Sequence, residues 1–277
     1  MNRYSLNRNK ETEDIILKTR REMNFLKTSG TIVGKILSEI SRFVRPGIST
    51  ARLEDVCRER VAYYSRERKI RKYPDFPTCL SVSVNNTAVH GVPDNTVLRS
   101  GDIVTLDLAL MVDGWYGDSA VTIPVRTIAP KHARLIDAAR DATLAGIRQA
   151  KAGNRIGDIG AAIQAAVEKY DAHLFEVLVG HGIGRTLHEG PVVFMKGEAD
   201  VGQPIVPGMV FTIEPVLTLG RTSYYKAEDG FSLITEDGEY TAMFEHMVAI
   251  LPDKTLVLTD IEQAWSGKKT IKAEGNA

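Results

Sequence analysis

An internal repeat limits the folds that this chain can adopt. The segment SGDIVTLD at 100–107 is matched later by PGMVFTIE at 207–214, and both segments end in an acid. The next strand of each half carries another acid, in DSAV at 118–121 and in EHMV at 245–248. Apolar residues at helical spacing precede each segment in both halves. Repeats of this kind indicate equivalent units that pack on each other.

Each half is therefore predicted to contain two helices and then a pair of strands. A pseudo-two-fold axis between the halves would place the strand pairs side by side in one sheet, with four carboxylates at its centre. The expected fold class is α/β (α+β), with duplicated helix-helix-strand halves around a central antiparallel sheet. A chain of 277 residues fits one large domain or two small ones.

The clearest local signal is the segment GDIVTLDLALMVDGWYGD at 101–118. It alternates like a strand, meets the hairpin dipeptide Asp113-Gly114 and continues as a second strand. With these two residues at the turn, Asp107 faces Ala120. Asp118 then lies diagonal to Asp107 on the same face, roughly 7–8 Å away. Two unpaired carboxylates on an apolar face would be costly, so a cation is expected between them.

The other elements follow from apolar spacing, caps and breakers. The basic run at 66–72 is expected to be a solvated loop. The segment 78–91 is expected to carry one short strand ending at His90-Gly91. Helices are predicted from Glu11 to about Val44, from Ser49 or Thr50 onward, from Pro130 to about Ala152, and from about Gly157 to Tyr170.

The four acids need positive charge nearby, and the sequence has no matching buried Lys or Arg to supply it. Carboxylates with an imidazole suit divalent Mn, Fe, Co or Zn. The segment HGIGRTLHEGP supplies His181 and His188, and its glycines at 182 and 184 are expected to let the backbone approach a ligand closely. A two-metal site would hold its ions roughly 3.5–4 Å apart around a bridging hydroxide nucleophile. The four acids are Asp107, Asp118, Glu214 and Glu245.

Several other functions are disfavoured. The formal net charge of zero argues against nucleic acid as the main ligand. The chain has no apolar run of the ~18 residues that span a membrane, and its polar start is no secretory signal. Cys57 and Cys79 give no disulfide framework and suit a reducing cytosol, so a cytoplasmic location is expected. The glycine-rich segment lacks the lysine of a phosphate-binding loop.

Taken together, the motifs strongly resemble those of type I methionine aminopeptidases. They are SVNNTAVHGVPD, GDIVTLDLALMVDGWYGD, GHGIGRTLHEGP, PGMVFTIEP and FEHMV, in that family's order and spacing. The resemblance implies the pita-bread fold in a single catalytic domain over about 11–262, with a flexible arm at 1–10 and a flexible tail at 266–277. It also implies a dinuclear site of two divalent ions, Co, Mn, Fe or Zn.

The resemblance also implies a role for each site residue. Asp107 would bind one ion, His181 and Glu214 the other, and Asp118 and Glu245 would bridge both. His90 and His188 would contact the scissile amide and stabilise the tetrahedral intermediate. Glu214 would also handle the proton of the attacking water.

The residues that match the family's methionine pocket include departures from the usual pattern. Bacterial relatives often have Cys at the position of Ser81, Phe at Leu187 and Trp at Phe231. The expected pocket is apolar and wider than usual, which predicts a preference for Met with tolerance of Leu or norleucine. Its residues are Tyr73, Phe76, Ser81, Leu187 and Phe231.

The resemblance implies that the substrates are nascent polypeptide N-termini that carry the initiator Met followed by a small residue. A transient ribosome contact of the N-terminal arm and a monomeric state are further expectations. No direct nucleic-acid function and no membrane association are expected. Two alternatives stay open: an Xaa-Pro aminopeptidase or dipeptidase of the same fold, and a divergent non-catalytic paralogue that only binds.

Overall fold

The computed structural model describes residues 15–259 and 261. The predicted arm at 1–10 and tail at 266–277 lie outside this part of the chain. In the first half, the elements are α1 (Arg20–Ser41), α2 (Thr50–Tyr64), β1 (Ile70–Lys72), β2 (Ser81–Val84), β3 (Thr87–Val89), β4 (Ile103–Val112) and β5 (Trp115–Pro124). In the second half, they are α3 (Pro130–Gln149), α4 (Ile156–Val167), β6 (His173–Leu174), β7 (Gly180–Gly182), β8 (Glu189–Val193), β9 (Val210–Ile213), β10 (Val216–Thr218), β11 (Tyr224–Lys226), β12 (Leu233–Thr235), β13 (Thr241–Ile250) and β14 (Thr255–Val257).

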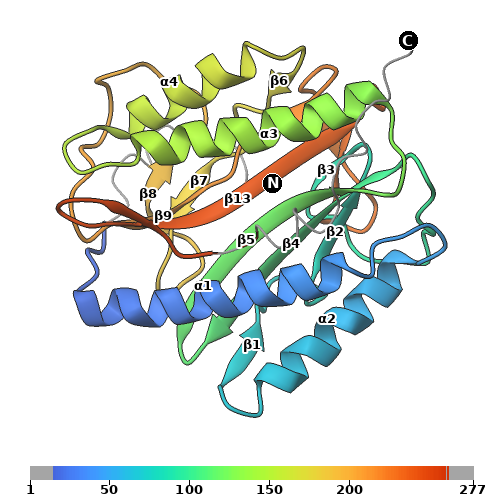
Figure 1. The fold of residues 1–277 in the computed structure, drawn as a ribbon, viewed down its shortest axis with the longest axis horizontal. Helices are drawn as coiled ribbons and strands as arrows, with labels where there is room; N and C mark the ends of the chain where they lie inside the picture. Colours follow the sequence, from blue (N-terminus) through green and yellow to red (C-terminus); the bar gives the residue numbers. More distant parts are fainter. Residues whose placement is uncertain (1–14, 260, 262–277) are drawn as a thin grey trace, which may run out of the picture.

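The two halves share one sheet, as the repeat predicts. Its strands follow the order β1-β4-β5-β13-β9-β7-β8, with further short strands off this path. The repeated pairs β4–β5 and β9–β13 are therefore neighbours, and they join where β5 meets β13 antiparallel. In Figure 1, α3 and α4 lie on one side of the β5–β13 pair, and α1 and α2 lie on the other. The predicted pseudo-two-fold arrangement is confirmed.

The β4–β5 hairpin has the predicted register. Asp107 lies opposite Ala120, and Val112 lies opposite Trp115. Asp113 and Gly114 have φ angles of 51° and 87°, as the tight hairpin turn requires. Asp107 and Asp118 thus occupy the same face of the sheet, because side chains alternate between faces along each strand.

The helices cover the face of the sheet opposite to that of Asp107 and Asp118, and they are packed very closely on it. In α1, the Ser29 hydroxyl donates to the Tyr116 carbonyl of β5 at 2.9 Å. In α3, the Thr143 hydroxyl makes the corresponding bond to the Phe244 carbonyl of β13, also at 2.9 Å. The main core lies between these helices and the sheet, where both layers contribute fully buried Ile, Leu, Val and Ala. No helix among the described residues is long and apolar enough to cross a bilayer.

Three local predictions were wrong. The predicted helical residues 15–19 are not helical, because the backbone N–H of Lys18 bonds to the Gly208 carbonyl and a Thr19–Glu22 capping box opens the helix at Arg20. The start of that prediction, at 11–14, lies outside the described residues. The basic run is not entirely a loop, since its end forms β1, which pairs with β4. The segment 78–91 holds two strands, β2 and β3, rather than one.

The contact between α1 and β5 yields a stability prediction. A Cβ atom on Gly117 would lie 2.7 Å from the Ser29 carbonyl carbon and oxygen, which belong to backbone that cannot rotate away. We expect Gly117→Ala to destabilise the protein by about 3 kcal/mol, at the upper end for an overpacked core. Chemical unfolding measures this loss.

The matched control is Gly238→Ala. Gly238 has a φ of 75°, and no atom lies within 4 Å of the position that an added Cβ would take. Alanine there should lower the free energy of unfolding by about 1 kcal/mol, because only the left-handed backbone conformation is unfavourable. Equal losses for the two variants would contradict the close-packing explanation.

Candidate metal centre

Asp118 and Glu245 lie at the junction of the two halves. Gly117 faces α1, so its neighbour Asp118 points to the opposite face of β5. Glu245 of β13 pairs with Ala120 of β5, which brings its carboxylate beside that of Asp118. The two residues are only 6% and 2% exposed. Two acids are therefore buried together.

His181, at the centre of β7, turns its ring toward these acids. Its Nε2 lies 3.7 Å from Asp118 Oδ2 and 3.6 Å from Glu214 Oε1. Its Nδ1 lies 2.9 Å from the Gly182 carbonyl oxygen. A carbonyl can only accept, so the ring proton belongs on Nδ1 and the Nε2 lone pair faces the carboxylates. This is the orientation of a metal-binding histidine, with its second nitrogen held by the backbone.

Glu214 and Asp107 complete the group of acids. Thr212 fixes Glu214, since its hydroxyl donates to Glu214 Oε1 at 2.5 Å and accepts from the His181 backbone N–H at 3.0 Å. Asp107 lies on β4 opposite Ala120, and its charge raises the pKa of Asp118, Glu214 and Glu245. All four predicted acids and His181 are thus close together.

Burial makes this group of acids hard to ionise without a cation. Desolvation raises the pKa of Asp107 to about 7 and that of Glu214 to about 8. Desolvation and the neighbouring acids raise the pKa of Asp118 and Glu245 well above their usual values. Burial, followed by the charge of His188, lowers the pKa of His181 to about 3, so its ring is neutral.

The donor set fits a divalent cation. Asp118, His181 and Glu245 each offer a ligand atom, and these atoms lie within 4.8 Å of one another. The buried oxygens Asp118 Oδ1 and Glu245 Oε1 have no hydrogen-bond partner among the described residues. No described Lys or Arg forms an ion pair with the four acids. Carboxylates and one imidazole are ligands for Mn, Fe, Co or Zn.

Two further histidines lie at the edge of this cluster. The His188 and His181 rings meet edge to face with centroids 4.4 Å apart. His90 has a φ of 58°, and its carbonyl accepts a bond from the Ser232 hydroxyl at 3.3 Å. Desolvation and the charge of His188 lower the pKa of His90 to about 4. The His90 ring is therefore neutral and can contact a substrate as a hydrogen-bonding group.

Two predicted pocket residues lie against these histidines, and a third lies against one of the two. Tyr73 meets His188 with ring centroids 6.1 Å apart. Phe76 meets His90 at 6.4 Å and Phe231 at 5.4 Å. These aromatic side chains form an apolar border beside the acids.

The other two predicted pocket residues are buried near the same region. Ser81 lies opposite Asp107 in the β2–β4 ladder, and its hydroxyl has no partner among the described residues. Leu187 packs in a small buried cluster with Tyr73 at its margin. The structure thus brings Ser81 close to an acid and places Leu187 mainly in a core.

The expectation for the glycines at 182 and 184 needs correction. A Cβ on Gly182 would overlap the Gly190 carbonyl oxygen, and one on Gly184 would overlap Glu189 Oε1. The space beside both glycines is filled by the protein itself rather than left for a ligand. They allow the segment between β7 and β8 to fold tightly.

Comparisons with known proteins show the family of this chain. The pattern of metallopeptidase family M24 matches residues 24–252. Methionine aminopeptidase 1 of Bacillus subtilis is 34% identical over 247 residues, which cover 89% of this chain and all of that protein. The chain belongs to metallopeptidase family M24, among its methionine aminopeptidases.

Solved structures of M24 peptidases separate the two enzymatic interpretations. The methionine aminopeptidase of Rickettsia prowazekii has a TM-score of 0.85 at 31% identity, covering 89% of this chain and all of that one. The Xaa-Pro dipeptidase of Bacillus anthracis has a TM-score of 0.70 at 24% identity, and this chain spans 62% of it. The second likeness shows the fold alone. The chain is therefore a metal-dependent hydrolase with the pita-bread fold, as its motifs indicated.

Sequence reasoning missed several polar residues around the site. Thr212 lies two positions before Glu214, so strand alternation could have placed both on one face. Ser232 supports His90 from a distant turn, and no local signal points to it. Lys18 and Glu189 form a buried ion pair beside His188 that likewise joins distant segments.

The raised pKa values predict how metal-free protein responds to pH. An acid whose pKa is higher in the folded than in the unfolded state contributes stability that is fully present below its unfolded pKa, about 4. For Asp107 and Glu214, this stability is lost as the pH rises through about 7 and about 8. We expect the Tm of chelator-treated protein to fall between pH 5 and pH 9.

Added Mn²⁺ should raise the Tm more at pH 8 than at pH 5, because metal binds deprotonated ligands. The variant Asp107→Asn should weaken the pH dependence, since its amide does not titrate. Calorimetry with and without chelator measures both effects. A Tm of metal-free protein that is constant or rises over this range would contradict the prediction.

Proposed function

We propose that this enzyme removes the N-terminal Met from nascent proteins and peptides whose second residue is small. One observation carries the proposal: buried carboxylate oxygens without partners lie beside a neutral His181, next to two further histidines and an apolar border. That combination supports a cation site beside polar groups that suit an amide and an apolar border that suits an apolar side chain. The family membership and the similarity to methionine aminopeptidases support the same activity.

Two divalent ions, Co, Mn, Fe or Zn, would be held by Asp107, Asp118, His181, Glu214 and Glu245. When bound, such ions supply a hydroxide nucleophile at neutral pH. Asp118 Oδ1 and Glu245 Oε1, which have no hydrogen-bond partner in the described part of the chain, would suit both acids to bridging two ions.

The remaining polar roles belong to three side chains. Glu214 would take up and return the proton of the attacking water. His90 and His188 would contact the scissile amide and stabilise the charge that develops on its oxygen. The low pKa of His90 keeps that ring neutral, so it acts as a hydrogen-bonding group rather than as a cation.

The pocket for the first side chain would be formed by Tyr73, Phe76, Ser81, Leu187 and Phe231. The ring contacts of Phe76 with His90 and Phe231 support an apolar position next to the reacting amide. No charged residue is among the five, so a charged first side chain would be buried unpaired at high cost. A flexible, unbranched Met side chain fits such a pocket.

The substrate's context is also part of the proposal. The second residue should be small because it lies closest to the metal centre. The partners would be nascent polypeptide N-termini, met in the cytoplasm by a monomeric enzyme, with a transient ribosome contact through the N-terminal arm. The proposed activity does not depend on these points.

Substrate preference gives the direct test. A panel of Met-Ala-Ser, Met-Gly, Met-Lys and Ala-Pro peptides is assayed with Mn, Co, Fe and Zn separately. We expect release of Met from the first two and little from Met-Lys or Ala-Pro. Replacement of the first Met by Leu or norleucine should reduce kcat/KM only moderately, since one methylene is worth ~1–3 kcal/mol.

Two outcomes would contradict the proposal. Cleavage of Ala-Pro without cleavage of Met-Ala would favour an Xaa-Pro enzyme. The absence of cleavage with every metal would favour a binding protein of this fold.

The role of His188 is tested by His188→Ala. If the ring serves the substrate rather than the metal, kcat should fall on the order of 10²–10³-fold while metal content stays normal. Kinetics and metal analysis of purified protein measure both. The comparison variant is His181→Ala, which should lose metal. Loss of metal in His188→Ala would show that its role is assigned wrongly.

A further inference from the structure

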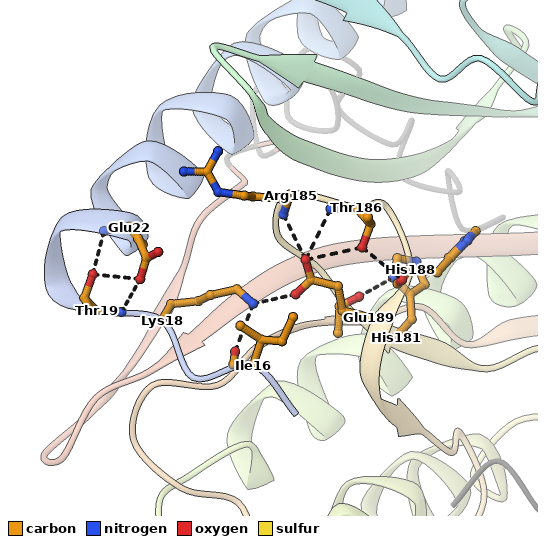
Figure 2. Close-up of polar contacts among 10 residues, drawn as sticks. Ile16, Lys18, Thr19, Glu22, His181, Arg185, Thr186, His188 and Glu189 are labelled. Carbon is orange, nitrogen blue, oxygen red and sulfur yellow. Dashed lines mark hydrogen bonds and ion pairs between the residues drawn. The ribbon is translucent and has the colours of Figure 1, made fainter. Parts of the chain in front are cut away.

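A buried ion pair lies next to the segment that carries His188. Lys18 Nζ is 2.5 Å from Glu189 Oε2, and the two side chains are only 2% and 5% exposed. Lys18 Nζ also donates to the Ile16 carbonyl at 2.9 Å. Figure 2 shows this pair between the start of α1 and the segment that joins β7 to β8.

The other oxygen of Glu189 organises that joining segment. Glu189 Oε1 accepts from the backbone N–H of Arg185 at 2.9 Å and of Thr186 at 3.2 Å. The Thr186 hydroxyl in turn donates to the His188 carbonyl at 3.2 Å. His188 is thus held on one side by its neighbour Glu189 and on the other by Thr186 (Figure 2). The Glu189 carboxylate fixes both of these residues.

The same segment is fixed to the first half of the chain. The Gly184 carbonyl accepts from the Tyr116 backbone N–H at 2.8 Å. The Arg185 guanidinium lies over the Trp115 ring, 4.4 Å from its centroid. A Cβ on Gly184 would lie 2.7 Å from Lys18 Cε, so glycine makes the room for the ion pair.

Lys18 reaches this place because the chain before α1 lies against the second half. Ile15 bridges to Gly190, directly after Glu189, and the Lys18 backbone N–H donates to the Gly208 carbonyl at 2.7 Å. The chain then turns at Thr19 into α1, which packs on the first half. The N-terminal segment therefore connects both halves at the His188 segment.

A buried ion pair is weak evidence for stability, since apolar side chains of similar size often replace one without loss. Its geometry here points to positioning, because, among the described residues, the Glu189 oxygen that does not face Lys18 bonds only to Arg185 and Thr186, in the segment that carries His188. We propose that the Lys18–Glu189 pair is a positioning element that sets the orientation of the His188 ring relative to His181 and the acids. This inference rests on the proposed function in that His188 contacts the substrate.

The two variants follow from hydrogen-bond chemistry. A carboxylate accepts on both oxygens, whereas an amide has one acceptor and one donor. Glu189→Gln must therefore place a donor against either Lys18 or the two backbone N–H groups. Lys18→Met removes the cation and keeps a side chain of similar length.

The first measurement uses metal-free protein and needs no activity. The chain has six histidines, and the ring signals of His188 in NMR spectra are assigned by their absence in His188→Gln. We expect them to shift or broaden in Lys18→Met and in Glu189→Gln, as the ring leaves the neighbouring rings of His181 and Tyr73. His132, stacked on Tyr240 with centroids 3.9 Å apart, is the internal control and should not change.

The second measurement is a double-mutant cycle on kcat. A residue that acts through His188 should lose its effect once that ring is removed. We expect Lys18→Met and Glu189→Gln to lower kcat at least about tenfold alone, but no more than about twofold in a His188→Ala background. KM and metal content should change little.

Both variants are first checked for cooperative unfolding. If the single variants do not fold, Lys18→Met/Glu189→Gln removes both charges and takes their place in both measurements. The control for general destabilisation is Ile159→Val, a fully buried change in α4 that should leave the His188 signals and kcat unchanged.

The outcomes separate this inference from the proposed function. Unchanged His188 signals in folded variants, or equal losses of kcat with and without His188, would overturn the positioning role. If the wild type cleaves no Met peptide, the proposed function fails, and the NMR result alone then decides whether the pair orients His188.

Discussion

The central feature of this structure is the burial of Asp118 and Glu245 where β5 meets β13. Two carboxylates in that position would repel each other, and each has an oxygen without a described partner. They are tolerable only if they are protonated or if a cation lies between them. The junction of the two halves is therefore also the place where folding, metal binding and pH become linked.

Duplication explains why the acids meet there. Each half supplies a strand pair with an acid on each strand or, for Glu214, directly after it, and each covers its outer face with two helices. The close contact of Gly117 with Ser29 fixes the face of β5 that meets α1. Because side chains alternate between faces along a strand, Asp118 points away from α1. His181 then joins from β7, with its ring fixed by the Gly182 carbonyl. The metal centre is thus a product of the repeated architecture.

The features predicted correctly from the sequence depend on short-range rules. The turn at Asp113-Gly114 sets the register of the hairpin, and the register sets the face of Asp107 and Asp118. The features that were missed join segments far apart in the chain. Thr212 holds Glu214 and the His181 backbone, and Lys18 pairs with Glu189 across 171 positions. A lysine before a helix carries no local sign of burial, so only the folded structure reveals it.

The residues that face the proposed substrate have a different origin from the proposed metal ligands. Tyr73 and Phe76 lie between β1 and β2, Phe231 lies between β11 and β12, and His188 lies between β7 and β8. None of these segments belongs to the repeated strand pairs. A change in a connection alters the apolar border while the acids stay in place, because the sheet alone sets the acids. This division would allow the apolar border to vary on one fold. His188 thus lies outside the repeat, where the N-terminal segment contacts its neighbours through the Lys18–Glu189 ion pair and the Ile15–Gly190 bridge. Under our proposal, the ion pair secures the orientation of the His188 ring from there.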